Sequence, residues 1–325
     1  MSDYDPDLTD DSSSESNPDS SVRITNKFSD LLEKTERLGA GGFGSVYKCV
    51  HTLEGKEYAV KRIELKNNRK QLEWCLREVK ALSCLEHKHV VRYYQSWTDT
   101  NWDGFSSTEG SQSQESEESK SQESEGSEDS PVKNLLYLFI QMEYCPSTLK
   151  SKLEEQPVNH FEVLTYLHHL VKGLDYIHNS GFLHRDLAMK NIFIGKDKRI
   201  KIGDFGLAKE LIGQDDDDMY CSHSPHSESI GIGFHRAPEL KQHQPYSKKS
   251  DFYALGITYL DMLLVHVETD HERSHIIDGI KKGIFPVDWK FDTALPRALL
   301  AELPEARPNA TQILKMIEDA KKARG

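Results

Sequence analysis

Hydrophobic and polar positions follow two periodicities along the chain, and short apolar runs dominate the first half. Four stretches rich in β-branched and aromatic residues predict strands joined by turns, at 37–50, 56–65, 89–97 and 134–144. Residues 68–85 instead place apolar side chains at helical spacing. The first part of the chain is therefore expected to be a sheet accompanied by one helix.

The second half shows the period of helices. Residues 160–181 predict a helix that ends at Gly181 and has one apolar face, formed by Phe161, Leu164, Leu167, Val171, Leu174 and Ile177. Residues 251–264 are almost wholly apolar and predict a buried helix. Asn309, with Gln312 three residues later, predicts the N-cap of a last helix. Strands followed by helices favour an α+β protein with a small sheet lobe and a larger helical lobe.

Two segments show neither pattern. Residues 1–22 and 99–133 are acidic and rich in Ser, with few apolar residues, so they cannot bury enough surface to offset the entropy of ordering. We expect both to be disordered. The second segment lies between two strand runs, and loop-closure entropy grows only slowly with length. It is therefore expected to be a surface insertion within one domain.

The negative charge is concentrated in these two segments. The formal net charge of the chain is −12. Residues 1–20 hold seven acids and no Lys or Arg, and residues 103–130 hold nine acids and one Lys. The rest of the chain therefore has a net charge of +3. The net charge of the whole chain is therefore evidence neither for nor against nucleic-acid binding. Because no appended RNA-binding module is recognisable, no direct nucleic-acid binding is expected.

Cysteine usage and hydropathy predict a soluble, cytoplasmic protein. The five cysteines form no CxxC pair, which is typical of reduced thiols, and Cys221, His223 and His226 lack a fourth ligand for zinc. The acidic run at 215–218 is typical of a solvated loop. The N-terminus shows no signal-peptide pattern, and the longest apolar stretch, 135–140, is too short to cross a bilayer.

A glycine-rich pattern G-x-G-x-x-G-x-V is formed by Gly39, Gly41, Gly44 and Val46. Glycines let backbone N–H groups approach phosphate oxygens without obstruction by side chains. Taken alone, the pattern also fits an ordinary Gly-rich hairpin. A dinucleotide-binding turn would need a helix next, whereas a strand follows here.

Charged residues further along the chain follow in the order that phosphoryl transfer requires. Lys61 in a strand run can reach phosphates, and Glu78 in the predicted helix can pair with it. In HRDLAMKN, Asp186 can accept the proton of a substrate hydroxyl and Asn191 can bind a metal ion, while Asp204 in GDFGLA can bind Mg²⁺. Each residue alone is typical of ordinary surface, so the order carries the prediction.

These motifs, closed by Ala-Pro-Glu at 237–239, resemble those of the eukaryotic protein kinase domain over about residues 30–320. The stretches VVRYYQSW, LFIQMEYC, IKIGDFGLA, FPVDW and PEARPNATQIL are similar to the kinases of the alpha subunit of translation initiation factor 2, of the double-stranded-RNA-activated and starvation-activated types. The resemblance implies a bilobal fold, with an antiparallel-sheet N-lobe containing one helix at 30–143 and a larger helical C-lobe at 146–320.

The same resemblance implies a Ser/Thr protein kinase that uses ATP and Mg²⁺. Asp186 would be the catalytic base, Lys61 and Lys190 catalytic cations, and Asn191 and Asp204 the metal ligands. The nucleotide site would consist of Leu38, Gly39, Ala40, Gly41, Gly42, Phe43, Gly44, Ser45, Val46, Lys61, Glu78, Glu143 and Cys145.

Other residues take structural roles by this resemblance alone. Met142 would be the gatekeeper of the adenine pocket, and the backbone of Glu143 and Cys145 would meet the base. Asp251 would hold the catalytic loop in place. A second structural pair would be formed by Glu239 and Arg307.

The resemblance also implies partners and regulation. The substrate would be the alpha subunit of translation initiation factor 2, docked near Thr269. In the resembled family, an N-lobe dimer contact uses a tyrosine, an arginine and an aspartate. Tyr93 matches the tyrosine, whereas Lys27 stands at the arginine and Leu31, next to Asp30, at the aspartate. The resemblance therefore implies a homodimer through the N-lobe. Activation is expected from phosphorylation between Asp204 and Glu239, with Arg185 as the cation that binds the phosphate. The candidate residue is Ser227, with Ser224 and Ser229 as rivals.

The chain departs from the Ser/Thr kinase pattern at Ala188, where a lysine is expected, at Ile232, where a threonine is expected, and at His235. In Ser/Thr kinases the lysine expected at position 188 contacts the γ-phosphate. HRDLAMKN instead resembles the loop of receptor tyrosine kinases, in which a basic residue four places after the base takes this role, and Lys190 stands at that position. We therefore expect a live enzyme, slower than its relatives, in which Lys190 stands in for the missing lysine. By the resemblance, this enzyme would repress translation. The alternative is a catalytically weak or inactive kinase-like protein that binds and regulates a related kinase or its substrate.

Overall fold

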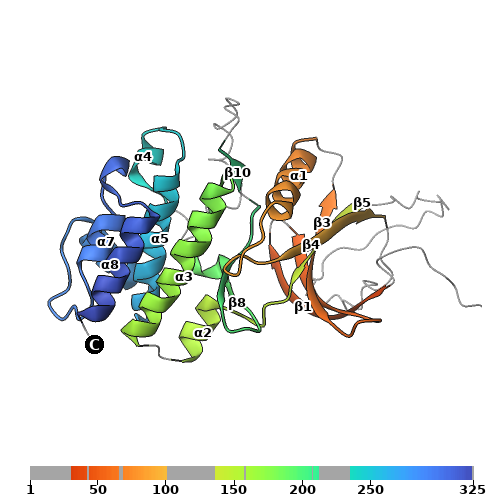
Figure 1. The fold of residues 1–325 in the computed structure, drawn as a ribbon, viewed down its shortest axis with the longest axis horizontal. Helices are drawn as coiled ribbons and strands as arrows, with labels where there is room; N and C mark the ends of the chain where they lie inside the picture. The colour runs from red at the N-terminus through yellow and green to blue at the C-terminus, as the bar shows by residue number, and fades with distance from the viewer. Residues whose placement is uncertain are drawn as a thin grey trace, which may run out of the picture.

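The computed structural model consists of two lobes (Figure 1). It describes residues 31–41, 44–65, 69–100, 136–156, 159–206, 208–211 and 235–323. Several expectations therefore lie outside the described residues: those on the tail at 1–22, on nearly all of the insertion at 99–133, and on Lys27, Asp30, Gly42, Phe43, 215–218, Cys221, His223, Ser224, His226, Ser227, Ser229 and Ile232.

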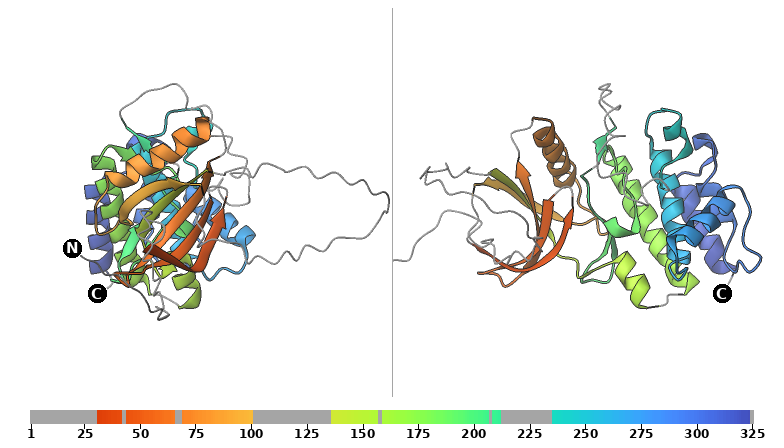
Figure 2. Two further views of the ribbon diagram at one scale, coloured as in Figure 1. Left: turned by 90° about the vertical axis from the view of Figure 1, so that its right-hand side faces the viewer. Right: turned by 180° about the vertical axis from the view of Figure 1, so that it is seen from behind.

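The N-lobe is a five-stranded antiparallel sheet with one helix, as the sequence predicts. Its elements are β1 (Leu32–Gly41), β2 (Gly44–His51), β3 (Glu57–Leu65), α1 (Arg69–Ser83), β4 (Tyr93–Asp99) and β5 (Leu136–Glu143). The strand order is β1-β2-β3-β5-β4, so the two strands that flank the acidic insertion pair with each other. Figures 1 and 2 show α1 on the side of the sheet nearer the C-lobe.

The two faces of this sheet are covered by different apolar clusters. On one face, Cys75 and Leu82 of α1 pack with Ile63 and Ile140 in a core that continues into the C-lobe. The opposite face carries a smaller cluster of Leu32, Tyr47, Cys49, Tyr58, Val60 and Phe139. Because side chains alternate along a strand, Lys61 shares the face of Ile63 and points toward α1.

The C-lobe is helical and contains the larger part of the core. Its helices are α2 (Leu149–Glu155), α3 (His160–Asn179), α4 (Pro238–Lys241), α5 (Lys248–Leu263), α6 (Asp270–Lys281), α7 (Ala294–Leu299) and α8 (Ala310–Lys322), with 3₁₀ turns η3 (Met189–Asn191) and η5 (Pro304–Ala306). As predicted, α5 is buried on nearly all sides. The expected capping box is confirmed, because Asn309 accepts from the Gln312 N–H and Gln312 from the Asn309 N–H.

The predicted apolar face of α3 is correct except at its first position. Five of its six members are buried, but Phe161 is 62% exposed. At 100° per residue, Phe161 lies about 60° or more from the other five around the helix axis, which puts it at the edge of the stripe. Its ring instead lies beneath the ammonium of Lys321, 4.9 Å from the ring centroid.

Short strands at the lobe boundary hold the segments that carry the motifs. One small sheet has the order β6-β8-β9 and another pairs β7 with β10. These strands are β6 (Ser147–Thr148), β7 (Phe182–Leu183), β8 (Ile192–Ile194), β9 (Ile200–Ile202) and β10 (Lys209–Glu210). HRDLAMKN therefore connects β7 to β8, and the loop with Asp204 connects β9 to β10.

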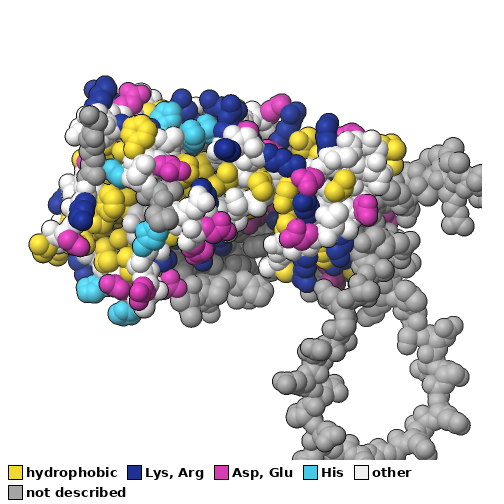
Figure 3. All heavy atoms as spheres, turned by 90° about the horizontal axis from the view of Figure 1, so that it is seen from below, with side chains coloured by type: hydrophobic (Ala, Val, Ile, Leu, Met, Phe, Trp, Pro, Cys, Tyr) yellow, Lys and Arg dark blue, Asp and Glu magenta, His cyan; other side chains and the backbone are white. Residues whose placement is uncertain are grey.

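Charged side chains of both signs are interspersed over both lobes on the face shown in Figure 3. Basic and acidic groups also pair locally, as in the contact of Lys80 with Glu210 at 2.6 Å, which links α1 to β10. Among the described residues, the charges on this face are therefore mixed rather than of one sign.

Candidate active site

A lysine on β3 and a glutamate on α1 meet at the lobe boundary. Lys61 Nζ lies 2.7 Å from Glu78 Oε1 and 3.4 Å from Asp204 Oδ1, and the side chains of Lys61 and Glu78 are buried. Burial disfavours the ammonium, but the two carboxylates outweigh it and raise the pKa of Lys61. Lys61 is therefore a fixed positive charge, and the structure brings together three of the predicted site residues.

Asp204 is held in a strained backbone conformation next to this lysine. Its φ of 57° lies in the left-handed region that residues other than Gly rarely adopt. The following residue, Phe205, is fully buried and lies edge-on to His184, at 5.1 Å between ring centroids. Burial favours the neutral acid, but Lys61 outweighs it and lowers the pKa of Asp204. Asp204 is therefore a carboxylate at neutral pH.

The loop that begins HRD is fastened to α5 by one buried carboxylate. Asp251 accepts from the backbone N–H groups of His184 at 3.0 Å and Arg185 at 2.9 Å. The Tyr246 hydroxyl donates to the same carboxylate at 2.7 Å, and His178 Nε2 lies 2.8 Å from it. The expected contact of Asp251 with this loop is confirmed. Arg185 has a φ of 70° and its guanidinium lies over the Tyr246 ring.

The Asp186 carboxylate is surrounded by the residues that follow it. Asn191 Nδ2 donates to the backbone oxygen and to Oδ2 of Asp186, both at 2.8 Å. Lys190 Nζ lies 3.5 Å from the same Oδ2. Ala188, where a lysine was expected, precedes the 3₁₀ turn η3 and supplies no polar side chain. The structure therefore places Asp186, Lys190 and Asn191 together.

The glycine hairpin pairs β1 with β2, and two of its glycines have different surroundings. Gly44 has a φ of 117°, and a Cβ there would lie 2.1 Å from the backbone oxygen of Arg62, so only glycine fits. A Cβ at Gly39 would meet nothing within 4 Å. Gly44 is therefore required by the approach of β3, whereas no described atom requires glycine at position 39.

The segment after β5 connects the lobes and contains the residues expected at adenine. The Glu143 N–H donates to the Arg92 backbone oxygen at 2.8 Å, so any backbone contact of Glu143 with a base must use its carbonyl. The Glu143 carboxylate lies 3.1 Å from the buried Lys201 ammonium of β9. Met142 packs against the core, and burial raises the pKa of the Cys145 thiol to about 12.

The oxygen donors of Asn191 and Asp204 fit a hard divalent cation. Asn191 uses Nδ2 for both bonds to Asp186, which leaves its amide oxygen as a ligand atom. Asp204 supplies a carboxylate. Mg²⁺ in phosphoryl-transfer sites takes one or two such ligands together with substrate phosphates and water. No group of three or more His, Cys, Asp or Glu that could hold a metal occurs among the described residues.

Other predicted residues lie away from this group of charged side chains. Arg307 and Glu239 form the expected pair, with two hydrogen bonds of 2.8 and 2.7 Å. Thr269 is the N-cap of α6, and its hydroxyl accepts from a backbone N–H. The Tyr93 hydroxyl donates to Ser96 at 3.1 Å.

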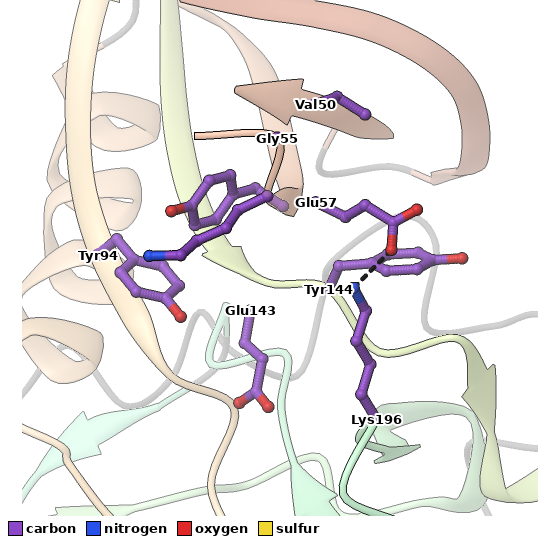
Figure 4. A pocket seen from close by; sticks show the side chains of 9 residues that line it. Val50, Gly55, Glu57, Tyr94, Glu143, Tyr144 and Lys196 are labelled. Atoms are coloured by element: carbon purple, nitrogen blue, oxygen red, sulfur yellow. Dashed lines mark ion pairs between the residues drawn. The ribbon is translucent and has the colours of Figure 1, made fainter. Parts of the chain in front are cut away.

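Sequence reasoning missed a cavity of about 480 Å³ that lies beside the segment joining the lobes (Figure 4). Tyr58 and Tyr94 from the N-lobe line it, together with Tyr144. Lys196 from the turn after β8 pairs with Glu57 of β3 at 2.5 Å and so bridges the two lobes. Tyr58 lies on the face of β3 opposite Lys61, but Glu143, which is expected at the adenine base, also lines this cavity. Single lysines and tyrosines far apart in the sequence gave no signal for it.

The fold and the arrangement of these residues are those of a protein kinase domain. A family model described as "Protein kinase domain" matches residues 32–323, and the chain belongs to this family. A protein kinase domain is built to use ATP and a divalent metal ion. In the described part of the chain, no helix is both long and apolar enough to span a membrane.

Among curated proteins, the chain is similar to kinases of translation initiation factor 2. It is 37% identical over 321 residues to "eIF-2-alpha kinase GCN2" of Arabidopsis thaliana, covering 91% of this chain and 25% of that protein. It is 34% identical over 308 residues to the "Interferon-induced, double-stranded RNA-activated protein kinase" of Rattus norvegicus, covering 92% and 54%. "Serine/threonine-protein kinase Nek4" of Mus musculus is 28% identical, covering 86% and 31%. The chain thus spans between a quarter and about half of the length of these relatives.

Proposed function

We propose that this chain is an ATP- and Mg²⁺-dependent Ser/Thr protein kinase. The observation that carries the proposal is the contact of the buried Lys61 ammonium with Glu78 and Asp204. Phosphoryl transfer asks a protein mainly for positioned charge, and this contact joins the sheet, α1 and the metal-binding loop in one arrangement. A structural salt bridge would not need a third partner at the strained backbone of Asp204.

The residues of the cleft divide the work of the reaction. Lys61 binds phosphate oxygens, and Glu78 holds its ammonium in position. Asp186 orients the substrate hydroxyl and accepts its proton, while Asn191 fixes the orientation of the Asp186 carboxylate. Mg²⁺ bound by Asn191 and Asp204 would neutralise negative charge on the phosphates.

We also propose the alpha subunit of translation initiation factor 2 as the substrate, which would make the chain a repressor of translation. The support is the 37% identity to a protein named as a kinase of that subunit and the 34% identity to a double-stranded-RNA-activated protein kinase. The proposal includes a cytoplasmic location and a homodimer formed through the N-lobe near Tyr93. In the monomer, the Tyr93 hydroxyl donates to Ser96 within its own strand.

The test is transfer of labelled phosphate from γ-labelled ATP to the purified alpha subunit and to a generic Ser/Thr peptide. Asp186→Asn, Lys61→Met and Asp204→Asn are each expected to slow transfer about 100-fold or more, because each removes charge placed for the transition state. If Asp186→Asn transfers phosphate as fast as the wild-type chain, the proposal that the chain is a protein kinase is wrong. Transfer to the peptide but not to the alpha subunit would refute the substrate alone.

A second candidate function is that of a catalytically weak or inactive kinase-like protein that binds a related kinase or its substrate. Ala188 favours it, because this residue supplies no charge beside Asp186. The contact of Lys61 with Glu78 and Asp204 speaks against it, since an inactive domain has no need to keep these charges together. Wild-type transfer no faster than that of Asp186→Asn, combined with tight binding to the alpha subunit, would favour this candidate.

A further inference from the structure

A lysine of β9 is buried beside the segment that joins the lobes. The side chain of Lys201 is 7% exposed, and its ammonium lies 3.1 Å from Glu143 Oε2 and 3.7 Å from Asp197 Oδ2. Lysine is almost never buried to this extent unless it is paired. The side chain of Glu143 is 22% exposed and that of Asp197 is 41% exposed, so water screens the contact with Glu143 less. Glu143 is therefore the main partner of Lys201.

The same glutamate is also held by the backbone beside it. The Glu143 N–H donates to the Arg92 oxygen at 2.8 Å, and Glu143 Oε2 accepts from the Arg92 N–H at 3.3 Å. The loop that contains Arg92 is bonded to β9 in turn, because the Val91 N–H donates to the Ile202 oxygen at 2.8 Å. Lys201 therefore closes a ring of contacts that links the last residue of β5, the loop before β4, and β9.

The stem of Lys201 lies across a glycine of the turn between β8 and β9. A Cβ at Gly195 would lie 2.5 Å from Lys201 Cε and 2.6 Å from Asp197 Oδ1, which is closer than such atoms approach. The φ of Gly195 lies outside the left-handed region, so no strain of that kind opposes an alanine. Gly195→Ala would therefore displace the Lys201 stem and the Asp197 carboxylate, while both charges of the pair between Lys201 and Glu143 stay in the chain.

Lys201 stands between the two ends of the proposed nucleotide site. Asp204, the expected metal ligand, follows it by three residues in the chain, and Glu143 and Cys145 are expected at the base. Because the Glu143 N–H is already bonded to Arg92, its backbone can offer a base only the carbonyl oxygen, which is an acceptor. The exocyclic amino group of adenine is a matching donor. A nucleotide spans both ends, so their spacing decides whether this hydrogen bond forms when the phosphates are bound.

We propose that Lys201 is a positioning residue of the nucleotide site. Its buried ion pair with Glu143 holds the end of β5 so that the backbone there accepts a hydrogen bond from the exocyclic amino group of adenine. This inference rests on the proposed kinase function, and it names a residue that selects the base. Lys201 acts through Glu143 and needs no contact of its own with the nucleotide. A held acceptor favours a base that carries the donor, whereas an acceptor that can move away does so less.

The same turn contains a matched control for this lysine. Lys196 pairs with Glu57 of β3 at 2.5 Å, but its side chain is 56% exposed, and exposed ion pairs contribute little. Lys196→Met therefore breaks a second lysine–glutamate pair near Lys201 and leaves the contact with Glu143 in place. The set of variants is Lys201→Met, Gly195→Ala, Lys196→Met and Arg307→Met. The last is a control for lost stability, because it breaks a buried ion pair within the C-lobe.

Calorimetry measures the affinity of each variant for MgADP and for the magnesium complex of purine riboside 5′-diphosphate, which lacks the amino group. Wild-type protein should prefer ADP about 5- to 10-fold, the size expected of one neutral hydrogen bond. Lys201→Met should bind ADP more weakly by about the same factor, and its preference for ADP should fall below about twofold. Lys196→Met should behave as wild type. Gly195→Ala should lose part of the preference, by about twofold or more.

A purely structural role would lower the melting temperature of Lys201→Met and leave its preference for ADP unchanged, as we expect for Arg307→Met. An unchanged preference in Lys201→Met therefore overturns the proposal, and so does a wild-type chain that shows no preference. If Lys201→Met does not fold, Gly195→Ala decides the question, because an unchanged preference in that variant overturns the proposal as well.

Binding needs no turnover, so this measurement separates the role of Lys201 from the proposed function as a whole. If Lys201→Met loses the preference while wild-type phosphate transfer is no faster than that of Asp186→Asn, the kinase function is refuted and the role of Lys201 stands. Measurable wild-type transfer together with an unchanged preference in Lys201→Met overturns the role of Lys201 alone. A wild-type chain that binds neither nucleotide overturns both.

Discussion

Arg307→Met should destabilise the C-lobe strongly, and in a way that depends on pH. The Arg307 guanidinium is fully buried, donates two hydrogen bonds to Glu239, and also donates to the backbone oxygens of Ala301, Lys249 and Glu302. The variant leaves the buried Glu239 carboxylate without its cation. Removing one partner of a buried ion pair costs about 3–5 kcal/mol. At about 2–4 °C per kcal/mol for a domain of this size, the melting temperature should fall by about 6–20 °C.

The pH dependence follows from the sign of the pKa shift. Burial favours the neutral acid, but Arg307 outweighs it and lowers the pKa of Glu239 in the wild-type protein. The stability from this group is therefore present at neutral pH and is lost as the pH falls through the lowered pKa. Without Arg307, burial is opposed only by the hydrogen bonds from Ser250 and from the backbone, so the pKa of Glu239 should rise and acid should relieve part of the cost. The difference between wild type and Arg307→Met should shrink between pH 7 and about pH 5.

Calorimetric melting of Arg307→Met, Glu239→Gln and the double mutant at both pH values is the assay. The double mutant should regain most of the stability lost in Arg307→Met, because no unpaired charge remains. The control is Lys150→Met, which breaks an exposed ion pair and should cost less than about 1 kcal/mol. A loss below about 1 kcal/mol in Arg307→Met, or an equal loss at both pH values, would refute the reasoning.

Three further predictions concern regulation, docking and acid stability. Ser227, outside the described residues, should be phosphorylated in active protein, and Ser227→Ala should lower the transfer rate; mass spectrometry that finds Ser227 unmodified in fully active protein contradicts this. Thr269→Asp should weaken transfer to the folded alpha subunit but spare a peptide, because Asp also caps a helix and keeps α6 intact; equal loss on both substrates argues against docking. Burial lowers the pKa of the stacked His89 and His169 rings to about 4, so the melting temperature should fall as the pH drops from about 6.5 toward 4. His169→Phe should make the melting temperature depend less on pH in this range. An unchanged pH dependence would show that these histidines do not cause the loss of stability.

Local patterns were enough to predict most elements and the order of the motifs. The predicted strand at 56–65 is β3 (Glu57–Leu65), and the predicted helix at 160–181 is α3 (His160–Asn179). Asn309 caps α8 as expected. Side-chain period and capping depend on residues close together in the chain, so they can be read without knowing the fold. Phe161 was misplaced because its neighbours in space, not its spacing, decide the burial of a position at the edge of a stripe.

Only the tertiary structure decided which motifs touch. Lys61 and Asp204 are 143 residues apart, and their contact depends on how the sheet, α1 and the loop after β9 pack together. The sequence places Lys190 four residues after Asp186, but a 3₁₀ turn anchored by buried Met189 decides that the ammonium lies beside the carboxylate. The cavity around Tyr144 has no local signature at all. Contacts between distant elements depend on the packing of both lobes, which no pattern of spacing along the chain specifies.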